Sequence, residues 1–436
     1  MMLCRSVCFF LLSAFHLSIP LHASFVFQDT SPKSKADSLL KVAVTLHTSG
    51  RYLEAIKTFL LARADTGSAN DRFNLGLSYA ALNDFERANE FLREAVHLDS
   101  VNINYRYQLA RFLVQAGAVR EGEFQYEEIL SGDSTYIPAL FSLGLLYNES
   151  HSYDEAADMF RRLLALNGND FLCHYYLGSV LVGLGNQDSA SVCLMSCLKL
   201  NPTFVPAMNV LASIHYVKKR YVEALALYQQ AYSLRPNNAD FIYKVGLCYR
   251  NLEQYAPATE AFRKAVQLDS LDAQYLGNLG HAYFRVDKYD SSAFAYKRAI
   301  TIDAENSIWH LNLALALQKL DSIESAANAY RQAILTYHPD AIADIYVKLG
   351  NLLFLSKKYH EAIEAYQSAL RFDPANRDAQ FYIGSAYDDL SDIPEAIRNY
   401  TKYLKLAEDI SIEMKRREWT NTRLKTLNQL QKLKKK

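Results

Sequence analysis

The sequence of 436 residues is poor in glycine, proline, cysteine and tryptophan and has no excess of charge of either sign. It contains 16 Gly, 10 Pro, 6 Cys and 2 Trp, whereas half of its residues are apolar and 30 are Tyr. So few helix-breaking residues in a chain of this length indicate a long, mainly helical protein.

The zero net charge conceals an uneven distribution. Residues 24–410 carry 37 basic and 45 acidic side chains, whereas residues 411–436 carry nine basic and two acidic ones. A nucleic-acid track would need a basic stripe along the chain, so the mildly acidic main segment argues against nucleic acid as a partner. We interpret the basic tail as a solvated end of the chain.

Motifs for catalysis and cofactor binding are also lacking. The sequence has no G-x-S-x-G, H-E-x-x-H, P-loop or G-x-G-x-x-G pattern, and its 11 His residues are scattered without partners at a useful spacing. A zinc site at His174 would match no ligand spacing typical of zinc. We therefore expect no enzyme, no catalytic residues, no cofactor and no metal site.

What the sequence does have is a repeat of 34 residues, interrupted once by a step of 36 residues. One column of small residues recurs at this spacing, a second follows 12 positions later, and an aromatic residue usually lies four positions beyond that. Two antiparallel helices approach closely only where small residues let the larger side chains of the other helix fill the groove. The spacing therefore predicts eleven helical hairpins, with a first column of Ala43, Gly76, Ala110, Gly144, Gly178, Ala212, Gly246, Gly280, Ala314, Gly350 and Gly384.

This pattern resembles the tetratricopeptide repeat, which has the same period. The resemblance implies an all-α solenoid, a right-handed superhelix of about eleven helix-turn-helix repeats over residues 38–408. A single hairpin is insufficient, because ordering 34 residues costs roughly 50 kcal/mol and needs about 2,000 Å² of apolar burial. We expect each repeat to pack on the next, and a capping helix with the basic tail to end the array at residues 409–436.

The first 23 residues differ in kind from the rest. Arg5 precedes an apolar run from Val7 to Leu17, which a proline and small residues follow. This order predicts a secretory signal peptide over residues 1–23 and a polar linker over residues 24–37. The alternative is an uncleaved anchor, although the run is shorter than the roughly 20 apolar residues of a span. We expect export, most simply to the periplasm or cell envelope of a bacterium, with no stable membrane span after cleavage; a eukaryotic secretory route stays open.

Two cysteines leave one question open. Cys173 falls at the start of a first helix and Cys197 at the end of the second helix of the same repeat, so the two thiols would be neighbours and oxidation after export would join them. Cys197 also occupies a column that is otherwise mostly alanine, which favours a small, buried, unpaired side chain.

The candidate binding residues rest on the family resemblance. With Gly76 at position 8 of its repeat, positions 2, 5, 9 and 12 share one stripe of the first helix. In the tetratricopeptide family that stripe lines a concave groove. Here it is largely aromatic, and no repeat combines the Lys and Asn of the family's clamp for C-terminal carboxylates. The candidate groove residues are Phe73, Tyr107, Phe141, Tyr175, Tyr216, Tyr243, Arg250 and Phe284.

We therefore predict a non-enzymatic scaffold of the cell envelope that binds protein or peptide partners, with Tyr107, Tyr175, Tyr243 and Arg250 as anchors of an extended peptide. Two alternatives stay open. The groove can instead recognise glycan or peptidoglycan strands, as part of an accessory to an envelope enzyme. The aromatic residues at position 5 can also serve only the packing of the fold.

Overall fold

The computed structural model describes residues 32–64, 67–336, 339–407 and 413–434. Helices make up 82% of these residues, and no strand occurs among them, which confirms the all-α repeat architecture. The chain divides into two compact units between Gly168 and Asn169. The predicted signal peptide, residues 1–23, lies outside the described residues.

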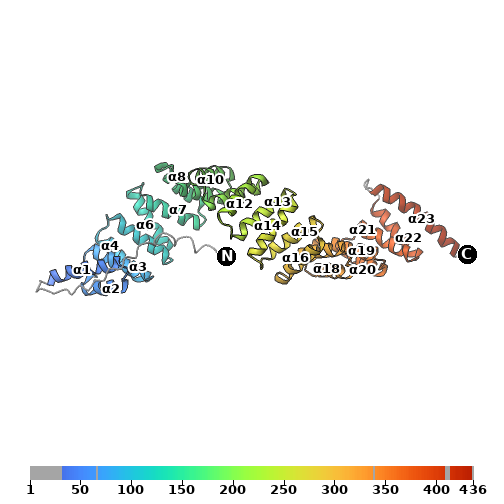
Figure 1. Cartoon of the computed structure of the whole chain (residues 1–436), viewed down its shortest axis with the longest axis horizontal. Coiled ribbons are helices and arrows are strands. Elements are labelled where there is room, and N and C mark those ends of the chain that lie inside the picture. The colour runs from blue at the N-terminus through green and yellow to red at the C-terminus, as the bar shows by residue number, and fades with distance from the viewer. Residues whose placement is uncertain (1–31, 65–66, 337–338, 408–412, 435–436) are drawn as a thin grey trace. The chain divides into compact units, whose positions relative to one another are not determined.

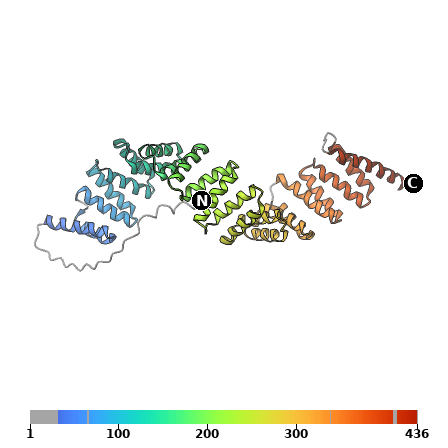
Figure 2. The ribbon, with the colours of Figure 1, turned by 45° about the horizontal axis from the view of Figure 1, so that its top comes forward.

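In each unit, consecutive helices lie side by side as hairpins joined by short turns (Figures 1 and 2). The first unit contains α1 (Pro32–Thr48), α2 (Tyr52–Leu61), α3 (Ala69–Ala81), α4 (Phe85–Leu98), α5 (Ile103–Gln115), α6 (Val119–Gly132), α7 (Ile137–Glu149) and α8 (Tyr153–Leu166).

The second unit continues with seven hairpins and one further helix. It contains α9 (Phe171–Gly183), α10 (Gln187–Leu200), α11 (Val205–Val217), α12 (Tyr221–Leu234), α13 (Ala239–Asn251), α14 (Tyr255–Leu268), α15 (Ala273–Arg285), α16 (Tyr289–Ile302), α17 (Ser307–Lys319), α18 (Ile323–Thr336), α19 (Pro339–Leu355), α20 (Tyr359–Phe372), α21 (Arg377–Asp389), α22 (Ile393–Leu406) and α23 (Met414–Lys434).

The first hairpin begins earlier than the sequence pattern predicts. Helix α1 starts at Pro32, so the polar linker assigned to residues 24–37 needs correction from residue 32 onward. Proline is tolerated in the first turn of a helix because its missing N–H would have no partner there in any case. The lysines and alanine that follow are good helix formers, and they extend the helix toward its N-terminus.

The small residues are the points of closest approach within each hairpin. A Cβ atom on Gly246 would lie 2.6 Å from the ring of Phe262, and one on Gly280 would lie 3.0 Å from the ring of Tyr296. Both rings are buried, so neither can move away without disturbing the core. The role that the sequence assigns to this column, close packing of one helix on the other, is confirmed at these positions.

The aromatic residues four positions beyond the second column of small residues, which we call the aromatic column, include tyrosines whose hydroxyl groups form hydrogen bonds. Tyr330 donates to Oε1 of Gln318 at 2.9 Å, and Tyr366 donates to Oδ1 of Asn351 at 2.7 Å. Burial raises the pKa of Tyr330 to about 12. Each ring therefore fills the core of its hairpin while its polar end has a partner on the first helix.

The turn inside every hairpin contains one residue in the left-handed region. At position 15 of all eleven repeats φ lies between 52° and 87°. Such a residue ends a helix by letting the following amides bond back to its last carbonyl groups. Glycine fills the position in only three repeats, at Gly50, Gly117 and Gly185, and the other eight repeats carry a side chain there.

The step of 36 residues lengthens one helix without interrupting the core. Helix α19 has 17 residues, whereas the preceding first helix, α17, has 13. Tyr330 on α18 and Ile345 and Leu349 on α19 belong to one cluster of buried side chains. The hairpins before and after the step therefore share a continuous core.

Helix α23 takes the place of the first helix of a twelfth repeat. Neighbouring first helices contact each other at a spacing of 35 residues, as between Tyr243 and Asn278. Helix α23 keeps this spacing, because Arg423 binds Asp388. The side of α23 where a second helix would pack carries the exposed residues Met414, Glu418 and Asn421. This largely polar side is what the end of a solenoid requires.

Candidate partner-binding surface

The predicted groove residues all lie on first helices, but they belong to two units. The first unit holds Phe73 on α3, Tyr107 on α5 and Phe141 on α7; the second holds Tyr175 on α9, Tyr216 on α11, Tyr243 and Arg250 on α13, and Phe284 on α15. The structure describes each unit by itself.

In the first unit, the aromatic residues at position 5 contribute to packing. Phe73 is only 7% exposed and its ring centroid lies 4.5 Å from that of Tyr105, so Phe73 is a core residue and not part of a binding surface. Tyr107 is half-buried, and its hydroxyl lies 3.3 Å from Oγ of Ser142 on the next first helix. Phe141 meets the ring of Phe160 edge-on at 6.1 Å.

In the second unit, Tyr175 and Phe284 also have aromatic neighbours. The ring of Tyr175 lies 5.2 Å from that of Phe204, and the ring of Phe284 lies 5.3 Å from that of Tyr289. Both residues are half-buried. Each keeps part of its ring at the surface while the rest supports the hairpin.

A ladder of hydrogen bonds links the first helices α11, α13 and α15. Nδ2 of Asn251 donates to the hydroxyl of Tyr216 at 2.7 Å, and Nδ2 of Asn278 donates to the hydroxyl of Tyr243 at 3.0 Å. A third bond runs from Nζ of Lys244 to Oδ1 of Asn209 at 2.9 Å. Each bond joins residues 35 apart, so we call the three bonds the inter-repeat ladder. The ladder brings the predicted residues Tyr216 and Tyr243 into one polar and aromatic strip.

Arg250 lies in the same strip. Its guanidinium group donates to Oδ1 of Asn278, and the amide nitrogen of Asn278 donates to the hydroxyl of Tyr243. Burial, only partly offset by the charge of Arg250, raises the pKa of Tyr243 to about 12. Tyr243 is therefore a neutral hydroxyl at physiological pH, and Arg250 is held in place by a neutral amide.

Arg250 lies near other cationic groups, and the carboxylates of Asp272 and Asp240 also act on Tyr243 in the same strip. The guanidinium group of Arg285 lies over the ring of Tyr255 at 3.9 Å, and burial together with Arg250 and Arg285 lowers the pKa of His281. Within the described residues no ion pair joins Arg250 or Arg285 to an acidic side chain. The guanidinium groups of Arg250 and Arg285, which have no ion pair among the described residues, can therefore bind an anionic group at this end of the strip.

The remaining sequence expectations concern cysteines, metals and membranes. Cys173, Cys197 and Cys248 are buried and form no disulfide, so the structure does not join Cys173 to Cys197. Within the described residues, no group of three or more His, Cys, Asp or Glu side chains is placed to hold a metal ion. None of the helices in the described ranges combines the length and the apolar character needed to cross a membrane.

Protein-family models match several parts of this array. Models for the TPR repeat and the tetratricopeptide repeat match residues 173–204, 198–239, 239–270, 273–306 and 350–391. The chain is a tetratricopeptide repeat (TPR) protein. A further model, for the anaphase-promoting complex, cyclosome, subunit 3, matches residues 49–129 of this TPR protein.

Two curated proteins are similar to parts of this TPR protein. The BBSome complex member BBS4 of Bos taurus is 25% identical over 224 residues, which cover 51% of the chain and 43% of BBS4. Protein O-mannosyl-transferase TMTC1 of Homo sapiens is 26% identical over 171 residues, which cover 38% of the chain and 19% of TMTC1. The chain thus spans less than half the length of either relative.

Solved TPR structures resemble parts of the chain as well. The C-terminal part of a TPR repeat-containing protein from Cytophaga hutchinsonii has a TM-score of 0.49 at 19% identity, covering 55% of this chain and 97% of its own. A tetratricopeptide repeat protein from Parabacteroides merdae has a TM-score of 0.42 at 19% identity, covering 57% and 98%. YrrB, a TPR protein with an unusual peptide-binding site, has a TM-score of 0.41 at 20% identity, covering 47% and 100%.

The sequence pattern of the TPR did not predict which side chains lie beside the predicted groove residues. Asn251, Asn278 and Arg285 lie at positions 6 and 13 of their repeats, outside the stripe of positions 2, 5, 9 and 12. A search for polar or aromatic pairs 35 residues apart would have found Tyr216 with Asn251 and Tyr243 with Asn278. A spacing of 35 residues indicates such a contact because it equals the 34-residue repeat length plus one residue along the next first helix.

Proposed function

We propose that this TPR protein is a non-enzymatic scaffold that binds an extended peptide segment of a protein partner across α11, α13 and α15. The observation that carries the proposal is the inter-repeat ladder together with Arg250, which has no acidic partner among the described residues. Helical repeats make up most of the described chain, and the TPR is a fold of protein interaction.

The chemistry of the strip fits an extended peptide. The half-buried rings of Tyr216 and Tyr243 offer apolar contact, and the hydroxyl and amide groups beside them can bind peptide N–H and C=O groups. Arg250 would bind an acidic side chain of the peptide, because a guanidinium group forms two parallel bonds with a carboxylate. Such an anchor is worth about 2 kcal/mol, or roughly 30-fold in affinity.

The test is a comparison of two arginine variants. Partners are captured on the wild-type protein from an envelope extract, identified, and titrated against wild type, Arg250→Ala and Arg263→Ala. Arg263 is a matched control because its ion pair, at 2.8 Å, is with Glu260 of its own second helix. We expect Arg250→Ala to weaken binding about 30-fold and Arg263→Ala to leave it unchanged.

Two outcomes would count against the proposal. An unchanged affinity of Arg250→Ala for every captured protein would remove Arg250 from the site. Co-sedimentation with polysaccharide, and no captured protein, would favour the glycan alternative. Tyr243→Phe adds a control for packing, because it keeps the ring near Tyr275, at 4.5 Å, and removes only the hydroxyl that Asn278 binds.

We also propose that the protein is exported to the cell envelope. The support is the order of Arg5, the apolar run and the small residues within residues 1–23, which lie outside the described residues. Mass spectrometry of the protein from each cell fraction should find a mature N-terminus near Ser24 in the envelope fraction. A full-length chain in the cytosol with Met1 intact would refute export.

A further inference from the structure

Helix α23 covers an acidic and aromatic surface on the last complete hairpin. This surface, the last-repeat face, consists of Asp378, Phe381 and Asp388 on α21 and Tyr400 on α22. The three α21 residues are positions 2, 5 and 12 of their repeat, the same stripe that was predicted to line the groove. The last-repeat face is therefore a stretch of groove stripe that already has an occupant.

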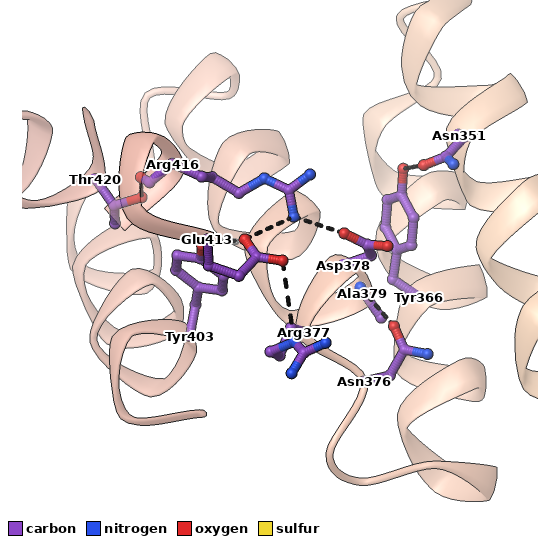
Figure 3. Close-up of polar contacts among 10 residues, drawn as sticks. All are labelled: Asn351, Tyr366, Asn376, Arg377, Asp378, Ala379, Tyr403, Glu413, Arg416 and Thr420. Carbon is purple, nitrogen blue, oxygen red and sulfur yellow. Dashed lines mark hydrogen bonds and ion pairs between the residues drawn. The ribbon is translucent and has the colours of Figure 1, made fainter. Parts of the chain in front are cut away.

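Arg416 makes the first set of contacts. It lies 2.6 Å from Oδ1 of Asp378, and its guanidinium group stands over the ring of Phe381 at 5.0 Å. Figure 3 shows Arg416 between Asp378 and Glu413, the residue that precedes α23. Glu413 in turn lies 3.4 Å from Arg416 and accepts a hydrogen bond from Tyr403 at 2.8 Å.

Arg423 and Trp419 make the second set. Arg423 donates two hydrogen bonds to Asp388, each 2.7 Å long, in the paired geometry that suits a carboxylate. The ring of Trp419 lies edge-on to Phe381 at 5.8 Å and to Tyr400 at 5.9 Å. Two basic residues and one aromatic residue of α23 thus cover the face.

Few residues of α23 are buried against the last hairpin. Thr420 and Leu427 are its only buried residues among those described, and Trp419 remains 49% exposed. Within the second unit, a first helix such as α13, α17 or α21 contacts both its own second helix and the preceding hairpin. Among the described residues, helix α23 has only the preceding hairpin. Leu427 and the partly buried Leu424 join an apolar cluster on that hairpin, and Arg416 and Arg423 add charged contacts that salt can screen.

We propose that the last-repeat face is a docking site for a basic, tryptophan-bearing helix of a partner protein, and that α23 is its exchangeable resident. The argument rests on the occupant seen in place, the charge complementarity between Arg416 or Arg423 and the two aspartates, and the one-sided attachment. The site is separate from the strip on α11, α13 and α15. Failure of either proposal leaves the other standing.

The probe is a fluorescent peptide with the native sequence of residues 413–434, titrated against the full-length chain. In wild type, the resident helix competes with the probe, so the measured affinity is reduced to the fraction of molecules in which α23 has left. Arg416→Ala with Arg423→Ala weakens the resident helix and leaves the face intact. We expect this double variant to bind the probe about tenfold more tightly than wild type does.

Two further variants fix the location and the specificity. Adding Asp378→Asn and Asp388→Asn to the double variant should abolish the gain, and so should about 0.5 M NaCl. Glu324→Gln is the matched control, because Glu324 pairs with Lys358 at 2.8 Å far along the chain from α23, and it should bind the probe as wild type does. Equal affinity of wild type and the double variant, or a gain that survives both asparagine substitutions, would overturn the proposal.

Hydrogen exchange on the wild-type protein keeps the proposal testable if a variant fails to fold. Amides of residues 414–434 should exchange faster than those of α22, because α23 leaves the face while the hairpin below it stays folded. Exchange of α23 and α22 at one common rate would show that the helix leaves only when the last hairpin unfolds. That result would contradict exchangeability.

Discussion

Replacement of Tyr330 by phenylalanine isolates the contribution of one buried hydroxyl group of the aromatic column. Tyr330 has no exposed surface and donates a hydrogen bond to Gln318 at 2.9 Å. The phenylalanine ring fills the same space, so the variant loses only this hydrogen bond at neutral pH. The loss should lower the free energy of unfolding by about 1 kcal/mol at pH 7.

The sign of the effect depends on pH. Burial raises the pKa of Tyr330 from 10.0 to about 12, so the folded state favours the neutral phenol. This contribution to stability is fully present below pH 10 and is lost as the pH rises toward about 12. At pH 11 wild type should have lost about 1.4 kcal/mol at this residue, since one pH unit above the unfolded pKa corresponds to that amount. Tyr330→Phe has no group to ionise and loses nothing there.

The advantage of wild type over Tyr330→Phe should therefore fall by about 1.4 kcal/mol, from about 1 kcal/mol at pH 7 to slightly below zero at pH 11. Urea unfolding of both proteins at both pH values, followed by circular dichroism, measures the two differences. A TPR array can unfold in several steps, so the comparison uses the transition that shifts between the two proteins. Other buried tyrosines, such as Tyr228, ionise in both proteins and cancel in the difference.

An advantage of wild type that is the same at both pH values would refute the reasoning. It would show that the Tyr330 hydroxyl ionises equally in the folded and unfolded chain, and therefore that the ring is not enclosed between the two helices of its hairpin. The packing assigned to the aromatic column would then be wrong at this repeat.

Three further predictions concern the turns, the columns and the thiols. Lys219→Gly should raise the free energy of unfolding by about 0.5 to 1 kcal/mol in a urea titration, because Lys219 has a φ of 58° that glycine adopts without steric cost; a decrease would contradict this. Gly246→Ala should lower the melting temperature and cost about 1–3 kcal/mol, since the added Cβ would lie 2.6 Å from Phe262; unchanged melting would show that the hairpin can open there. Burial raises the pKa of Cys173 and Cys248 to about 12, so both thiols should react with an aromatic disulfide reagent only after denaturation, and rapid labelling of the native protein would contradict their burial.

Much of the fold was predictable from the sequence because close helix approach leaves a direct mark on it. Where two helices lie so close that only a methyl-sized side chain fits between them, the contact position tolerates only glycine, alanine or serine. Small residues such as Gly246 and Gly280 therefore recur at the contact and reveal the period. The turn residue at position 15 was not recognised, because its backbone requirement is met by many residue types, among them Lys219 and Asp287. The division between Gly168 and Asn169 leaves no mark in either column of small residues.

The sequence predicted a capping helix over residues 409–436, but not its register as the first helix of a twelfth repeat, for a physical reason. Helix α23 has no second helix to approach among the described residues, so its position 8 has no need of a small residue and carries Glu418. Its register shows instead in the contacts with the preceding repeat, through Arg423 and the buried Thr420. These contacts depend on the side chains of the preceding hairpin, and the 34-residue period does not specify those side chains.

The candidate site was predictable only in part. Helical spacing is enough to place Tyr216, Tyr243 and Arg250 on one stripe. It cannot show that Asn278 joins Tyr243 to Arg250, because that contact depends on how one repeat is set against the next. For the same reason it could not show that Phe73 is covered by Tyr105 of the following repeat.

The most direct test of the central claim, that a partner peptide lies on the first helices α11, α13 and α15, is site-specific photocrosslinking. Tyr216 on α11 and Phe294 on α16 are each replaced by p-benzoylphenylalanine, which keeps an aromatic ring at both positions. Phe294 is the control, because it is 65% exposed on a second helix. We predict that the partner crosslinks at position 216 and not at position 294. Crosslinking at position 294 alone, or equally at both positions, would contradict the assignment of the binding surface.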